Sequence, residues 1–156
     1  MLLEGSALGV LIRQTGVWSY ALINLGHVTG VAMLFGAVLL LDLRLIGVWP
    51  QVPLAALSLP ADRLAQTGFA IAVTSGICLL ATNGSEYVGN PFLRIKFLAI
   101  GAGLLNVLAL KRLPAWRQHR ERALGPAERR RLAVAGGLSL VCWSVALGCG
   151  RMVGYW

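Results

Sequence analysis

Two ionisable residues inside apolar stretches of the sequence could do chemistry there. His27 is the one histidine within a long apolar run, and Lys96 lies five residues into another run that begins at Pro91. A charged side chain in the hydrocarbon of a membrane costs roughly 2.5–3.5 kcal/mol on insertion scales. Each of the two residues therefore needs a partner or a function.

The chemistry open to His27 and Lys96 follows from their side chains. A neutral imidazole is a good ligand for haem iron or copper. An inward lysine can bind a carboxylate, ligate a metal when neutral, or transfer a proton. The structural alternatives are a core histidine bonded to a backbone carbonyl, a Ser or an Asn, and a lysine that extends to the outer head groups.

Several residues could complete a site around His27. Gly26 and Gly30 form a Gly-x-x-x-Gly pattern beside it, which admits either another helix or a flat macrocycle. Asn24 lies about one turn before His27 on the same face and could orient a ligand. Arg151 directly follows the last apolar run, where it either anchors the end of the bundle or adds a second cation for an anionic ligand.

The residues that follow Lys96 at helical spacing predict an inward face. They are Ile100, Gly103 and Asn106, a stripe with one small and one polar member. Arg94, two residues before Lys96, points to another side of the same helix. The two cations therefore cannot serve one site equally.

Three other ionisable residues are expected to have structural roles. Asp42 and Arg44 are two residues apart and do not face each other on one helix, so we predict that they pair with neighbouring helices or with the basic loop. His119 lies among arginines and is predicted to be a solvated loop residue.

The composition indicates that this chain lies in a membrane rather than in water. It has 156 residues, of which 57% are hydrophobic and 13% charged, with a formal net charge of +8. A basic soluble protein would suggest nucleic acid, but here most cations lie in one short segment between two apolar runs, which is a topology signal. They are Lys111, Arg112, Arg117, Arg120, Arg122, Arg129, Arg130 and Arg131. The predicted partners are membrane lipids rather than nucleic acid.

The apolar runs predict an all-α integral membrane four-helix bundle, with residues 1–156 as a single transmembrane domain. A hydrocarbon core of about 30 Å needs roughly 20 apolar helical residues. Four segments meet this requirement, at about 20–45, 64–82, 91–110 and 132–150. The segment 2–17 is too short and is predicted to be a short N-terminal interfacial helix. The Pro-containing segment 50–60 is predicted to be a surface loop.

The basic segment also predicts the orientation. Lys- and Arg-rich loops stay in the cytoplasm, and threading four spans from that point places both termini outside. His27, Lys96 and Arg151 then lie near the outer face. One membrane histidine is available per chain, so a haem with two histidine ligands would require two chains or a second ligand of another kind. Paired carboxylates within a span, HExxH and Ser-His-Asp sets are absent, so hydrolase chemistry has no support.

Several strings resemble a bacterial family of small four-helix membrane proteins known as a domain of unknown function, and the likeness covers nearly the whole chain. The strings are YALINLGHVTG at 20–30, LDLRL at 41–45, TGF at 67–69, SG at 75–76, NPFLRIK at 90–96 and GR at 150–151. More distantly, the layout resembles the HemJ-type membrane protoporphyrinogen oxidase and the CopD copper-resistance proteins.

The HemJ likeness implies a function for the pair. In those enzymes a histidine early in helix one and a lysine early in helix three act together and b-type haem is bound, and His27 and Lys96 occupy the matching places. The resemblance implies a redox or electron-transfer protein of the bacterial inner membrane. His27 would be the metal ligand and Lys96 the catalytic residue, with Gly30, Asn24 and Arg151 near the cofactor.

Two other classes of function stay open from the sequence. One is a non-catalytic accessory or assembly subunit, held in a homo-oligomer or a larger membrane complex by its small-residue helix faces. The other is transport of copper or a small anion past the level of His27.

Overall fold

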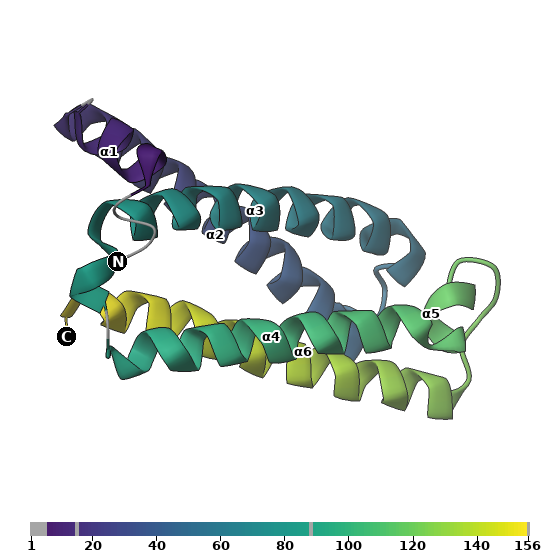
Figure 1. Cartoon of the computed structure of the whole chain (residues 1–156). Coiled ribbons are helices and arrows are strands. Elements are labelled where there is room, and N and C mark those ends of the chain that lie inside the picture. Colours follow the sequence, from purple (N-terminus) through teal and green to yellow (C-terminus); the bar gives the residue numbers. More distant parts are fainter. Residues whose placement is uncertain (1–5, 15, 88, 156) are drawn as a thin grey trace.

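The computed structural model describes residues 6–14, 16–87 and 89–155, and the regular elements among these residues are all helices (Figure 1). The four long helices are α2 (Val17–Ile46), α3 (Leu54–Asn83), α4 (Pro91–Arg112) and α6 (Pro126–Met152). The short ones are α1 (Ala7–Gln14), α5 (Pro114–Gln118) and the 3-10 helices η1 (Gly84–Tyr87) and η2 (Val153–Tyr155). The predicted all-α class is confirmed.

The long helices have the length and composition of membrane spans. Four candidate spans cover Trp18–Ile46, Leu54–Thr82, Pro91–Arg112 and Pro126–Tyr155. Large apolar side chains stay on the outside of the bundle, as with Trp18 at 84% and Leu98 at 74% exposure. Such a surface is stable against lipid rather than water. The chain is a multi-pass membrane protein.

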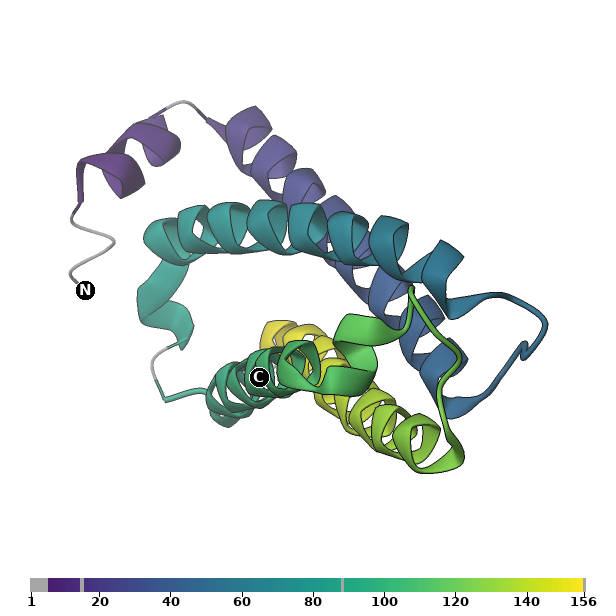
Figure 2. The same ribbon diagram turned by 90° about the vertical axis from the view of Figure 1, so that its right-hand side faces the viewer.

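The long helices form two packed pairs. α2 packs on α3 and α4 packs on α6, and α2 also packs on α6 and so joins the pairs (Figures 1 and 2). One end of the bundle carries α1, η1 and the C-terminus, and we call it the terminal end. The other carries α5 and the segment 111–131, and we call it the Arg-rich end (Figure 1).

Glycines set the distances between these helices. A Cβ on Gly30 of α2 would lie 2.6 Å from the backbone nitrogen of Ala72, and a Cβ on Gly68 of α3 would lie 2.5 Å from that of Leu34. The backbones of α2 and α3 therefore touch at this crossing, as is common where small residues face each other in membranes.

The structure corrects the prediction of a loop over 50–60. α3 begins at Leu54 and runs through Pro60, although a proline there removes one hydrogen bond of the helix. Tertiary contacts hold this turn in place, because Ser58 is fully buried and Ala61 is 5% exposed. The predicted span of 64–82 is therefore only the centre of a longer helix.

The Arg-rich segment is more helical than predicted. It contains α5, and α6 begins at Pro126 rather than near residue 132. Glu128 accepts hydrogen bonds from the backbone N–H of Gly125 at 2.9 Å and from the Arg122 guanidinium at 2.6 and 2.9 Å. These bonds with Glu128 raise the pKa of Arg122 and fix the start of the helix.

The predicted N-terminal helix is partly described. α1 covers Ala7–Gln14 and contacts α3 and α2, while residues 1–5 and 15 lie outside the described residues. Its position at a membrane interface stays a prediction.

Candidate functional site

His27 contacts α3 through one ring nitrogen. Its Nδ1 lies 2.9 Å from the carbonyl oxygen of Ala72 and 3.1 Å from the hydroxyl oxygen of Ser75. The Ser75 hydroxyl donates its own hydrogen to the carbonyl of Ile71 at 2.5 Å. α3 therefore fixes the orientation of the half-buried imidazole.

These contacts assign the tautomer of His27. A carbonyl oxygen can only accept a hydrogen bond, so Nδ1 carries the proton and donates to Ala72. In the neutral ring, Nε2 is then an unprotonated acceptor. No hydrogen bond to Nε2 joins it to the described residues. A histidine whose Nδ1–H bonds to a carbonyl while Nε2 stays free is the usual arrangement of a metal-binding histidine.

A glycine on α3 makes room for the ring. A Cβ on Gly76 would lie 3.1 Å from Cε1 of His27, so a larger residue would press on the imidazole. Gly30 instead faces α3 at the helix crossing, which is the helix-packing use of its motif. Asn24 is exposed on the outside of α2, and Gly26 has open space beside it.

Lys96 extends toward α6 at the terminal end. A Cβ on Gly150 would lie 3.4 Å from its Nζ, so the glycine leaves a notch for the half-buried lysine. The contacts of the described residues include no hydrogen bond between Lys96 and His27. Arg94 is exposed, as its different side of α4 predicted.

The predicted inward stripe after Lys96 is confirmed. Gly103 and Asn106 are buried and Ile100 is half-buried. Asn106 donates from Nδ2 to the carbonyl of Ala135 on α6 at 2.9 Å. α4 therefore presents this face to α6.

Arg151 is exposed at the terminal end. Its guanidinium donates to the hydroxyl of Tyr155 and lies over the ring of that residue, 4.6 Å from the centroid. The structure thus gives Arg151 a local partner in η2 and no contact with His27 or Lys96 among the described interactions.

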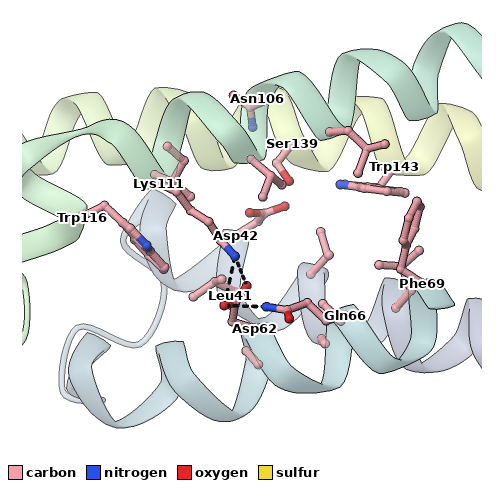
Figure 3. A pocket seen from close by; sticks show the side chains of 18 residues that line it. Leu41, Asp42, Asp62, Gln66, Phe69, Asn106, Lys111, Trp116, Ser139 and Trp143 are labelled. Atoms are coloured by element: carbon pink, nitrogen blue, oxygen red, sulfur yellow. Dashed lines mark hydrogen bonds and ion pairs between the residues drawn. The ribbon is translucent and has the colours of Figure 1, made fainter.

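A second polar region lies toward the Arg-rich end and was not predicted as a site. A cavity of about 130 Å³ lies between α2, α3, α4 and α6, and Asp42 lines it together with Ser139 and Trp143 (Figure 3). Asp42 was predicted to pair with neighbouring helices or with the basic segment, and the structure shows the first of these: its carboxyl group lies beside the Ser139 hydroxyl of α6. Polar residues inside apolar runs were the sequence signal for this region.

Two of the structural predictions are corrected by contacts at the Arg-rich end. His119 is half-buried rather than solvated: its Nε2 lies 2.8 Å from the Ser58 hydroxyl and its ring stacks on Trp116. Arg44 donates to the backbone carbonyls of the connection between α2 and α3, Val52 at 2.5 Å and Pro50 at 3.3 Å. Both side chains close the end of the bundle.

Within the described ranges, His27 is not part of a cluster of metal-ligating side chains. No three His, Cys, Asp or Glu residues gather there as a potential metal site.

The sequence model of the family of unknown function DUF6644 matches residues 2–156. This chain belongs to the DUF6644 family. For this DUF6644 protein, neither the curated proteins nor the solved structures provide a match.

Proposed function

We propose that this DUF6644 protein binds b-type haem or a related tetrapyrrole through Nε2 of His27 and has a redox or electron-transfer role. The observation that carries the proposal is the Nδ1 bond to the Ala72 carbonyl, 2.9 Å long. It leaves Nε2 as the ring atom with a lone pair for iron. Bound haem supplies one-electron redox chemistry.

The donor set on the chain fits such a group. One neutral imidazole can serve as the single axial histidine of a haem. Haem also carries propionate carboxylates, and Lys96 is a half-buried cation on α4 that could pair with one of them. Lys96 would hold a carboxylate or pass a proton, while Asn24 and Arg151, both exposed, would lie at the edge of the site.

The membrane placement belongs to the same proposal. The Arg-rich end lies in the cytoplasm of a bacterium, and the terminal end, with both termini, lies outside the inner membrane. α1 lies in the outer interface. His27 and Lys96 then lie near the outer face, where a haem held by His27 would supply electron transfer and Lys96 would pass protons.

An absorption spectrum tests the haem proposal directly. The wild-type chain, purified in mild detergent from cells supplied with haem, should show a Soret band, and His27→Ala should lose it. The chain has two histidines, so His119→Ala is the matched control and should keep the band. A wild-type protein without a Soret band, or a band that survives His27→Ala and disappears in His119→Ala, would refute the proposal.

Partner capture separates this function from that of an accessory subunit. An accessory subunit should co-purify with a larger complex in mild detergent, and His27→Ala should leave its retention unchanged. A haem-binding protein should show the Soret band in the absence of any partner.

A further inference from the structure

Two residues that line the cavity near the Arg-rich end each carry a deeply buried polar atom without a hydrogen-bond partner among the described residues. These atoms are Oδ2 of Asp42 and Nε1 of Trp143, whose residues are 3% and 5% exposed. Figure 3 shows both side chains at the cavity wall. Leaving a buried polar atom unpaired costs about 1–3 kcal/mol, so each of the two requires a ligand.

Glycines on neighbouring helices place these atoms. A Cβ on Gly136 of α6 would lie 3.1 Å from the backbone oxygen of Asp42, so only glycine lets α6 approach α2 there. Ser139, one turn further along α6, then lies beside the carboxyl group. A Cβ on Gly103 of α4 would lie 3.1 Å from Cε2 of Trp143, so the indole fits into the space left by that glycine.

The cavity continues from Asp42 to a charged pair that reaches the surface. Lys111 of α4 and Asp62 of α3 line the same cavity and form an ion pair of 3.0 Å. Their side chains are 39% and 32% exposed. Gln66 donates to Asp62 at 2.9 Å. The lining of the cavity therefore extends from the buried carboxyl group of Asp42 to this ion pair.

The charged and polar groups of the lining residues indicate what the cavity can bind. A metal cation would be opposed by the Trp143 N–H and the Lys111 ammonium, and an anion would be opposed by the two carboxyl groups. Water, which both donates and accepts hydrogen bonds, is opposed by neither set of groups. The cavity of about 130 Å³ is large enough to hold water.

We propose that this cavity is a proton-binding site, in which the Asp42 carboxylate takes up a proton from water that enters at the Arg-rich end. On uptake, a hydronium ion gives its proton to Oδ2, an O–H bond forms and a water molecule is released. On release, that O–H bond breaks and the proton returns to water. The neutral carboxyl is the form that costs less inside hydrocarbon.

The charged groups that face Asp42 are few. α3 presents Asp62 and α4 presents Lys111, which neutralise each other at the far side of the cavity. Arg44 on the same helix donates to the α2–α3 connection instead. The lining residues of α6 are neutral, so the carboxyl group has no direct ionic partner among the lining side chains.

Infrared difference spectroscopy of the full chain in lipid nanodiscs tests the proposal. The chain has six Asp and Glu residues, so the C=O stretching band of a protonated carboxyl group can be assigned by substitution. At neutral pH the wild type should show this band, and it should shift when H2O is replaced by D2O, because water reaches the group. Asp42→Asn should lose the band, and Glu121→Gln, the matched control at an exposed carboxyl group outside the cavity lining, should retain it.

Two outcomes would overturn the proton site: no protonated-carboxyl band in the wild type at any pH, or a band that persists in Asp42→Asn. A wild-type band that does not respond to D2O would contradict access by water. If Asp42→Asn does not fold, Ser139→Ala takes its place. Removing the neighbouring hydroxyl should move the frequency of the band, and an unchanged frequency would assign the band to another residue. None of these readouts depends on haem.

Discussion

At the scale of single residues, the environment of His27 explains why its sequence signal was incomplete. A histidine in an apolar run can be recognised in the sequence, because an ionisable group inside the membrane is costly and therefore indicates a partner or a function. Its partners cannot, because Ala72 and Ser75 lie on a helix 45 and 48 residues further along the chain. Those partners determine which ring nitrogen is free and hence what the histidine can bind.

Asp42 shows the same limit. The sequence predicted that Asp42 pairs with a neighbouring helix or with the basic segment. The structure shows the neighbouring helix, because Gly136 lets α6 approach α2 and neutral residues of α6 line the cavity together with Asp42. Which face of a helix meets a neighbour depends on such contacts, which no pattern within one apolar run reveals.

Replacing Ser75 tests the support of the histidine. Ser75→Ala removes one of the two acceptors of His27 Nδ1 but leaves the Ala72 carbonyl. We expect the affinity for haem to fall about tenfold, the lower end of the usual effect of losing such a supporting bond. Haem titration followed by absorbance measures it. Thr74→Ala, which removes an exposed hydroxyl, should leave the affinity unchanged, and an equal loss in both variants would contradict a specific role for Ser75.

Replacing Lys96 tests its part in binding a carboxylate. Lys96→Gln should weaken binding of haem, but should leave binding of haem dimethyl ester unchanged, because the ester has no propionate charge to pair. Titration of both ligands gives this difference. Arg94→Gln is the matched control, since Arg94 is exposed on another side of α4. Equal weakening for the two ligands would mean that Lys96 acts on the fold rather than on a carboxylate.

At the scale of elements, the sequence predicts where helices lie better than where they end. Runs of apolar residues locate all four spans, since only a helix satisfies its own backbone in lipid. Their ends depend on contacts. α3 passes through Pro60 because Ser58 is buried against His119, and α6 starts at Pro126 because Glu128 binds Gly125 and Arg122.

The crossing of α2 and α3 gives a prediction about stability. In Gly30→Ala the new methyl group would lie 2.6 Å from a backbone nitrogen, so the helices must separate. We expect a loss of about 1–3 kcal/mol in the free energy of unfolding, measured by SDS titration in mixed micelles. Gly36→Ala, on the same helix with nothing within 4 Å, should change it by less than about 1 kcal/mol. Similar values for the two variants would contradict the close crossing.

At the scale of the whole molecule, two helix pairs place the polar regions at different depths. His27 lies in the first half of α2 (Val17–Ile46), which begins at the terminal end (Figure 1), and the Asp42 cavity lies toward the Arg-rich end (Figure 3). The bundle thus holds a candidate redox site and a candidate proton site toward opposite ends.

Cysteine labelling tests the orientation of this arrangement. In a background without the three native cysteines, Gly154→Cys at the terminal end should react with an impermeant maleimide on intact cells, and Ala123→Cys at the Arg-rich end should not. Both positions are exposed, so both should react after solubilisation in detergent. Labelling of position 123 from outside would reverse the proposed topology.

The most direct test of the central claim is chemical rescue of the haem ligand. His27→Gly should lose the Soret band, and added imidazole should restore it, because free imidazole can take the place of the missing ring as the iron ligand. His119→Gly, the second histidine of the chain, should keep its band without imidazole. Failure of imidazole to restore the band of folded His27→Gly, or a band in that variant without imidazole, would contradict axial ligation by His27.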